Sequence, residues 1–281
     1  MIFKKIKDFL WGKKSEVKYI EYFHEDIIKD TLIVKEDKKD DRDYHILQAI
    51  HIDEDPKMPV KVDLRKYDTP IKNQGHLGAC TAFAFGSAYE SLRNFMKNKV
   101  KYKQGNFWDV SELFIYYNER KLMGTIHKDS GAFLRDGCRA LYKWGASLER
   151  FWPYKPFIFK TKPSWKAYFA GRWTRIQGYY RCHNLEEIKL SLSKGLPVIF
   201  GMQVYQNFYR YRQGIYNKIQ GSYQGGHALK LVGYDDDKQC FIVRNSWSTA
   251  WGDKGYFYIS YKLFEKITFS PWVIIPYGWK N

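Results

Sequence analysis

The chain carries a glutamine six residues before a cysteine, and that cysteine opens a segment with helical apolar spacing. The pair is Gln74 and Cys80, in the stretch Asn73-Gln74-Gly75-His76-Leu77-Gly78-Ala79-Cys80. Apolar residues then recur near every third or fourth position: Phe83, Phe85, Tyr89, Leu92, Phe95 and Met96. This spacing predicts a buried helix that begins at Cys80. Because unpaired N–H groups and the positive dipole end of a first helical turn lower the pKa of a thiol, the position favours a nucleophilic thiolate.

A lone buried cysteine is most often just a small apolar side chain, so a nucleophile needs partners elsewhere in the chain. A candidate base, His227, lies 147 residues after Cys80 in the stretch Gly225-Gly226-His227-Ala228-Leu229. A candidate orienting amide, Asn245, follows 18 residues later in the stretch Asn245-Ser246-Trp247. At these separations only the fold brings the groups together, and we expect His227 and Asn245 each to be presented by its own strand.

Three blocks of sequence, in this order, resemble the papain/cathepsin-like cysteine proteases. They are Gln74-Gly75-x-x-Gly78-x-Cys80, then His227-Ala228, then Asn245-Ser246-Trp247 continuing to Gly255-Tyr256. The resemblance covers residues 59 to 261. It implies an α+β fold of the papain-like two-lobed type, with a helical left lobe, an antiparallel β-barrel-like right lobe and the active-site cleft between them.

The resemblance also implies a role for each of these residues. Cys80 is the nucleophile, His227 is its acid–base partner, and Asn245 orients the imidazole. The Gln74 side-chain N–H and the Cys80 backbone N–H form the oxyanion hole. Trp247 shields the hydrogen bond between Asn245 and His227 from water. The implied activity is that of a cysteine endopeptidase acting through an acyl-enzyme, with a peptide or protein substrate and no metal or cofactor.

Contacts to the substrate are expected at small residues and one aromatic residue. Gly131 resembles the glycine that pairs with the substrate backbone in this family. Ala132, next to Gly131, is expected to contact the substrate. Phe133, Gly201 and Ala228 are expected to line the pocket for the second residue before the scissile bond, although core packing accounts for Phe133 nearly as well. The insertion 205–223 mixes tyrosines with basic residues. It could rim the cleft, and its composition also suits nucleic acid or carbohydrate.

Three residues depart from the family pattern. Thr81 replaces the usual aromatic residue after the nucleophile, Leu77 replaces a cysteine that often forms a disulfide, and Ser248 replaces the glycine after Asn-Ser-Trp. None of these changes removes a reacting atom. Two alternatives stay open: a binding or regulatory paralogue without turnover, and a cysteine amidase or transferase that acts on other amides.

The first part of the chain, residues 1–57, differs in charge from the rest. It holds twelve Lys/Arg against fourteen Asp/Glu, although the whole chain has a formal net charge of +17. An acidic leader before a basic body suits an inhibitory prosegment that is attracted to the domain it covers, as in a zymogen. The segment 1–11 fits a membrane-surface helix or a helix docked on the protein. We expect the peptidase domain to span 58–281, with a helical lobe over 70–170 and a β lobe over 171–281.

Cysteine use and hydropathy limit the remaining possibilities. With Cys80 as the nucleophile, an odd number of cysteines is left, namely Cys138, Cys182 and Cys240, which excludes a full disulfide framework. No paired cysteine–histidine spacing predicts a metal site. No apolar run is long enough to cross a bilayer, and the lysines in 1–11 interrupt any signal-peptide core. We therefore expect a monomer that is cytoplasmic or released by a non-classical route, and the +17 charge leaves nucleic acid or an anionic surface open as partner.

Overall fold

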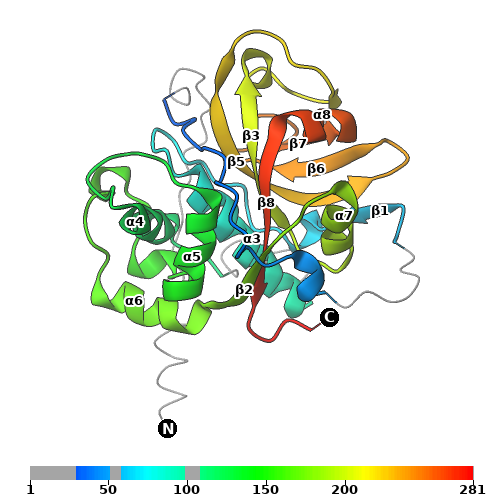
Figure 1. Ribbon diagram of the computed structural model, residues 1–281. Helices are drawn as coiled ribbons and strands as arrows, with labels where there is room; N and C mark the ends of the chain where they lie inside the picture. Colours follow the sequence, from blue (N-terminus) through cyan, green and yellow to red (C-terminus); the bar gives the residue numbers. More distant parts are fainter. Residues whose placement is uncertain (1–29, 51–57, 99–107, 281) are drawn as a thin grey trace.

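The computed structural model describes residues 30–50, 58–98 and 108–280 (Figure 1). The segment 1–11, for which the sequence suggested a surface or docked helix, lies outside these ranges. Helices gather on one side of the molecule and an extended sheet forms the other (Figure 1). None of the helices in the described ranges has the length and apolar character that crossing a bilayer requires.

The helical side is built around one central helix. Helix α3 (Cys80–Met96) is buried on nearly all of its faces, since fourteen of its seventeen residues are buried. It packs against α4 (Glu112–Met123), α5 (Leu134–Trp144) and strand β5 (Tyr223–Asp235). The shorter α6 (Trp165–Gly171) and the 3₁₀ turns η3 (Glu149–Phe151), η4 (Pro156–Ile158) and η5 (Arg172–Thr174) complete this side.

Local capping fixes the ends of these helices. Ser111 accepts a hydrogen bond from the Phe114 N–H at 3.1 Å, which caps the start of α4. Gly145 ends α5 with φ of +76°, and a Cβ built there would lie 2.0 Å from the Gly171 carbonyl oxygen. Only glycine allows this close approach, so the end of α5 and the end of α6 lie directly against each other.

The other side is an eight-stranded mixed sheet. Seven strands follow the order β2-β8-β3-β5-β6-β7-β4, and β1 pairs with β5 off this path. The strands are β1 (Lys61–Asp63), β2 (Ile176–Arg181), β3 (Val198–Tyr205), β4 (Ile215–Tyr216), β5 (Tyr223–Asp235), β6 (Cys240–Arg244), β7 (Tyr256–Ser260) and β8 (Thr268–Pro276). All pairs are antiparallel except β4 with β7. Helices α7 (Leu185–Ser193) and α8 (Tyr261–Ile267) and the 3₁₀ turn η6 (Gln206–Phe208) connect strands.

The α+β fold class predicted from the sequence is confirmed, with one correction to the form of the sheet. We expected an antiparallel, barrel-like lobe, whereas the sheet is open in the described part of the chain and contains one parallel pair. The predicted helix over 80–96 matches α3, and the turn at 235–238 joins β5 to β6. All four cysteines are buried and free, so Cys182 and Cys240 form no disulfide in this structure.

Buried ion pairs tie the segment before Gln74 to both sides of the molecule. The Lys72 ammonium lies 2.9 Å from Glu90 on α3 and 2.6 Å from Glu112 on α4. The Asp68 carboxylate lies 2.6 Å from the Lys230 ammonium on β5. Buried pairs of this kind add little net stability, but breaking one leaves an uncompensated charge, so they hold the geometry firmly.

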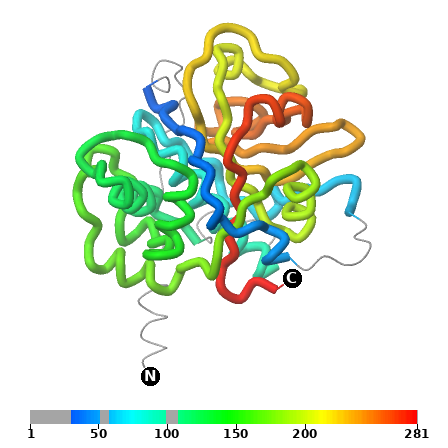
Figure 2. The backbone as a smooth tube through the Cα atoms, in the orientation of Figure 1, coloured from blue at the N-terminus to red at the C-terminus, as the bar shows by residue number. Residues whose placement is uncertain are grey.

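Residues 30–50 of the leader cross the molecule between the helical side and the sheet (Figure 2). Thr31, Leu32 and Val34 are buried. Ile33 forms a bridge with Gly226 on β5, and the 3₁₀ turn η1 (Ile46–Gln48) follows, with Ile46 fully buried. This part of the leader is therefore packed against the rest of the chain, with a strand-like bridge at Ile33 and a 3₁₀ turn at its end.

Candidate active site

Cys80 is the first residue of α3 and is fully buried. The backbone N–H of Ala228, the residue after His227, is hydrogen-bonded to its sulfur, so the thiol lies beside the histidine-bearing strand. Burial raises the pKa of the Cys80 thiol to about 12, although hydrogen bonds from backbone N–H groups act in the opposite direction. We expected a lowered thiol pKa at this helix end. In this covered form desolvation outweighs the effect of the helix terminus.

His227 lies on β5, opposite Met202 on β3. Its Nε2 is 2.8 Å from the Asn245 Oδ1, and its Nδ1 has no hydrogen-bond partner among the described residues. Burial lowers the pKa of the imidazole to about 4, and the Asn245 contact opposes this shift. Because Asn245 occupies Nε2, Nδ1 is the ring atom left to exchange a proton with the thiol. Neutral imidazole beside neutral thiol is thus the state that this structure favours.

Trp247 packs directly on the imidazole. The ring centroids lie 4.7 Å apart with an interplanar angle of 27°, and the indole is fully buried. Asn245 is held by a second contact, because its Oδ1 also accepts the Ser246 N–H at 2.8 Å. The ring and the amide together restrict the orientation of His227 and keep water from the hydrogen bond between them.

The Gln74 carboxamide is buried and its orientation is fixed from both ends. Its Oε1 accepts a hydrogen bond from the Ser246 hydroxyl at 2.7 Å. Its Nε2 donates to the Leu77 carbonyl at 3.2 Å and to the leader residue Thr31, whose Oγ1 lies 3.4 Å away. The amide N–H that the sequence assigned to the oxyanion hole therefore faces the segment of leader that fills the cleft.

Two glycines form the wall of the cleft that faces the leader. A Cβ at Gly78 would lie 2.6 Å from the Ile33 side chain, and a Cβ at Gly131, which has φ of +63°, would lie 2.7 Å from it. The sequence reasoning missed the two residues that hold this wall. Asp129 accepts the Gly78 N–H at 3.1 Å and the Tyr116 hydroxyl, and that hydroxyl accepts the Gly131 N–H at 3.1 Å.

The other expected substrate residues lie on both sides of the cleft. Ala132 is buried next to Gly131, and Phe133 is half-buried where it caps α5. Gly201 on β3 pairs with Ala228 on β5. The side of Gly201 that a Cβ would occupy is filled by the ring of Phe269, which no sequence motif had indicated.

Thr81, the residue that departs from the family pattern, contacts a buried acid. Its hydroxyl donates to the Glu119 Oε2 at 2.8 Å. Burial raises the pKa of Glu119 to about 8, and the charge of this carboxylate raises the pKa of Cys80. The other Glu119 oxygen has no hydrogen-bond partner in the described part of the chain. A titratable group thus stands directly behind the nucleophile.

Four aromatic residues of the insertion 205–223 face inward, whereas Tyr223 is 57% exposed. Phe208, Tyr209, Tyr211 and Tyr216 are buried, and Phe208 lies 5.5 Å from Trp247 between ring centroids. These rings support the Trp247 side of the active site. These four rings are therefore not available for stacking on nucleic acid or carbohydrate, whereas the ring of Tyr223 is exposed.

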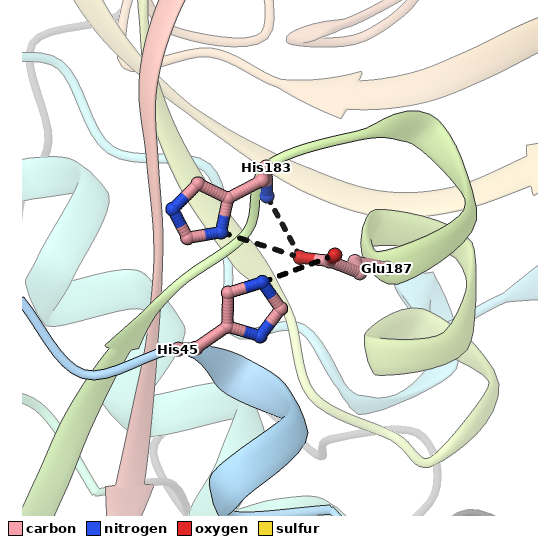
Figure 3. Close-up of side chains that lie close together, drawn as sticks. All are labelled: His45, His183 and Glu187. Atoms are coloured by element: carbon pink, nitrogen blue, oxygen red, sulfur yellow. Dashed lines mark hydrogen bonds and ion pairs between the residues drawn. The ribbon is translucent and has the colours of Figure 1, made fainter.

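One group of side chains has the donors that a metal ion would need. His45 of the leader, His183 and Glu187 place ligand atoms within 4.8 Å of one another (Figure 3). Two imidazoles and a carboxylate suit Zn²⁺. However, the His45 Nδ1 accepts the Leu47 N–H at 3.3 Å, so the ring proton belongs on Nε2, the atom that faces Glu187 at 3.3 Å. The cluster fits a contact between leader and body better than a metal centre.

Comparisons with known proteins cover most of the chain. Residues 58–270 match the family described as papain family cysteine protease. An uncharacterized peptidase C1-like protein of Acanthamoeba polyphaga mimivirus is 36% identical over 233 residues, which is 75% of this chain and 73% of that protein. A cathepsin L-like proteinase of Fasciola hepatica is 28% identical over 71% of this chain, and the match spans only 59% of the fluke protein.

Solved structures with the same fold include enzymes and precursors. Xylellain, a cysteine protease from Xylella fastidiosa, superposes with a TM-score of 0.72 at 30% identity, over 93% of this chain and 99% of that one. Digestive procathepsin L 3 of Tenebrio molitor superposes with a TM-score of 0.67, over 98% of this chain and 87% of that one, at 17% identity, which shows the fold alone.

Proposed function

Because this chain belongs to the papain family of cysteine proteases, we propose that it is a cysteine endopeptidase held in an inactive form by its own leader. The observation that carries the proposal is the path of Thr31–Val34 through the site. These residues lie between the nucleophile's neighbourhood and solvent, where a substrate would have to bind. The catalytic residues lie in the peptidase domain, and the leader blocks the cleft through which a substrate would reach them.

The leader contacts the cleft in the manner of an extended peptide. The Val34 N–H donates to the Gly226 carbonyl and the Gly226 N–H donates to the Leu32 carbonyl, each at 3.1 Å. The Ile33 side chain lies against Gly78 and Gly131 on the opposite wall. Pairing of backbone with a strand edge is a common way to bind a peptide, and here it would exclude any other peptide from the same strip.

A second set of contacts anchors the leader outside the cleft. The Arg135 guanidinium on α5 donates two hydrogen bonds to the Asp43 carboxylate, at 2.9 and 2.7 Å. Asp37 is buried, accepting the Trp272 indole N–H at 2.8 Å and the Arg135 backbone N–H at 3.1 Å. Charge-assisted hydrogen bonds of this kind are each worth about 1.5–3 kcal/mol.

Covering the site also changes the protonation of the reacting groups. Burial raises the pKa of Cys80 and lowers the pKa of His227, and both shifts favour the neutral pair. When the leader leaves, water reaches the cleft and both shifts lose their main cause. A proton can then pass from the thiol to the His227 Nδ1, which produces the thiolate and imidazolium needed for attack.

Peptide hydrolysis follows from the positions of the remaining groups. The Cys80 thiolate attacks the scissile carbonyl carbon, and the developing oxyanion accepts hydrogen bonds from the Gln74 Nε2 and the Cys80 backbone N–H. The imidazolium of His227 gives its proton to the leaving amine as the C–N bond breaks. Water, deprotonated by His227, then attacks the thioester, and the carboxylic acid leaves as the thiol is regenerated.

The proposal is tested by weakening the leader within the full chain. Ile33→Glu places a carboxylate against Gly78 and Gly131, whereas Leu47→Glu changes an exposed leader residue outside the cleft. We expect Ile33→Glu to raise turnover of dipeptidyl fluorogenic substrates and labelling by an epoxysuccinyl inhibitor at least tenfold, and Leu47→Glu to change neither. Cys80→Ala should abolish both signals.

Three outcomes would count against this function. Full activity of the unaltered chain would remove the inhibitory role of the leader. A folded Ile33→Glu chain that neither turns over peptides nor reacts with the inhibitor would favour a binding paralogue. Inhibitor labelling without any peptide turnover would favour a cysteine amidase or transferase that uses other amides.

A further inference from the structure

A surface pocket of about 620 Å³ lies on the helical side of the molecule, outside the catalytic cleft. It is formed by the last residue of α5, by α6, and by the segments just before and just after α6. The lining residues are Trp144, Lys162, Pro163, Trp165, Tyr168, Phe169, Arg172 and Arg175. The pocket therefore combines four aromatic rings with three cations, and it includes no carboxylate.

The absence of acidic groups extends well beyond the pocket. Between Glu149 and Glu186 the sequence has eight Lys/Arg and no Asp or Glu. The side chains of Lys162, Arg172 and Arg175 are exposed, and no ion pair holds them within the part of the chain that the structure describes. A cluster of this kind has a strongly positive local potential and attracts a polyanion.

The aromatic rings divide into a fixed floor and an open face. Tyr168 is fixed, because its hydroxyl donates to Asn118 at 3.0 Å and its ring packs edge-on against Phe114 at 5.0 Å. Trp165 is 71% exposed, and Trp173 beside the pocket is 55% exposed. Large apolar side chains gathered at one exposed spot mark binding surfaces in soluble proteins.

We propose that this pocket binds single-stranded nucleic acid. Arg172, Arg175 and Lys162 neutralise phosphates, and a base stacks on the exposed indole of Trp165, the combination that single-strand binders use. The donors in the lining favour this ligand over a neutral carbohydrate, whose hydroxyl groups need carboxylate or amide acceptors that the lining lacks. An acidic peptide would satisfy the cations but offers few planar rings for the indole.

The pocket and the cleft lie at opposite ends of the same helix. The first residues of α5 follow Gly131 at the cleft, and its last residue, Trp144, lines the pocket. Eleven helical residues span about 16 Å, so a bound strand leaves the cleft open. Nucleic acid at this site would concentrate the protease near nucleoprotein substrates without competing with a peptide.

The test measures how tightly the full chain binds a fluorescein-labelled oligothymidylate of about twenty nucleotides. Binding is monitored by fluorescence anisotropy at several salt concentrations. Arg172→Ala/Arg175→Ala removes two pocket cations, and Lys262→Ala/Lys266→Ala removes the same charge from exposed positions on α8. We expect the pocket pair to weaken binding at least tenfold and to lower the slope of log affinity against log salt by about 1.4, at about 0.7 per phosphate contact. The α8 pair should change affinity less than threefold.

Stacking is tested by Trp165→Ala, with Tyr277→Ala as a matched loss of an exposed ring. Loss of one stacked base corresponds to at least about fivefold weaker binding and to loss of the indole quenching caused by the oligonucleotide. Equal weakening by the pocket pair and the α8 pair would overturn the proposal, because it would mean diffuse attraction to a basic protein. The proposal would also be overturned if Trp165→Ala bound the oligonucleotide with full affinity. It would be overturned as well if a sulfated polysaccharide bound more tightly than the oligonucleotide and that binding depended on Trp165. Unchanged thermal unfolding of each variant shows that the fold is retained.

Discussion

The Thr81 hydroxyl donates to the Glu119 carboxylate at 2.8 Å, directly behind the nucleophile. The two residues lie on different helices, α3 and α4, and both are fully buried. The pair therefore connects the ionisation of a buried acid to the first turn of the helix that carries Cys80. Asp136 on α5 raises the pKa of Glu119 further, and Arg120 on α4 lowers it.

Replacing Glu119 with Gln should extend activity to higher pH. With a pKa of about 8, Glu119 is neutral at lower pH, and its ionisation above that value raises the pKa of Cys80. In the leader-released enzyme we expect kcat/KM to fall as the pH rises through about 8, and Glu119→Gln to remove that fall. Thr81→Ser keeps the donor and serves as the control. A fall near pH 8 that persists in Glu119→Gln would show that another group causes it.

Removing the Arg135 side chain should loosen the leader. Arg135→Ala breaks two hydrogen bonds to Asp43 and one to the Lys38 carbonyl. A loss of about 2 kcal/mol corresponds to an approximately thirtyfold larger population with an open cleft. The rate of epoxysuccinyl labelling of the full chain should rise accordingly. Arg139→Ala, which removes an exposed arginine from the same helix, should label at the original rate; equal rates for all three proteins would exclude Arg135 as an anchor.

The leader should be held more tightly in acid than near neutrality through Asp37. Burial raises the pKa of docked Asp37, although the Trp272 N–H and the guanidinium groups of Arg135 and Arg181 oppose the shift. Docking therefore takes up a proton, and its contribution is present at low pH and is lost as the pH rises through the docked pKa. Hydrogen exchange of the Val34 amide, measured from about pH 4 to about pH 7 and corrected for intrinsic exchange, should show falling protection. In Asp37→Asn that dependence should flatten, and a dependence that is unchanged or reversed would contradict this assignment.

The Ser248→Ala variant should be less stable than the Ser248→Gly variant. Its φ is +62°, in the left-handed region where a Cβ is unfavourable by about 1–2 kcal/mol, and its hydroxyl accepts the Ala250 N–H at 3.1 Å. Both variants lose that hydrogen bond, but only Ser248→Gly also removes the backbone strain. Urea unfolding should therefore give Ser248→Gly a free energy of unfolding about 1 kcal/mol above that of Ser248→Ala. The opposite order would mean that the strain is small.

The reacting residues could be named from the sequence because each lies in a short block with fixed spacing. Gln74 and Cys80 lie in one block, six residues apart, and Cys80 begins a helix. Asn245 begins the block that contains Trp247. The supporting residues could not be found this way. Asp129, Glu119 and Phe269 belong to none of these blocks, and they are identified by contacts that only the folded chain creates.

Helix α3 was predictable because its apolar residues recur near every third or fourth position. Strands β2 and β8 were not predicted. They pair residues about a hundred positions apart, and β8 also pairs with β3, so these contacts exist only in the folded chain. The thiol pKa was predicted in the wrong direction for a related reason. A helix terminus is visible in the sequence, whereas the burial of the Cys80 thiol in the folded chain is not.

The leader and the cleft belong to one covalent chain. The segment that joins them sets their effective concentration, and diluting the protein does not lower it. Tethers of this length hold their ends at roughly millimolar effective concentration, which makes even a weak set of contacts sufficient to keep the cleft filled. Once the chain is cut between the leader and Lys61, the leader is a separate peptide. Its binding to the cleft then depends on the concentration of the protein. A single cleavage would thus make the fraction of closed sites depend on protein concentration, whereas in the uncut chain it does not.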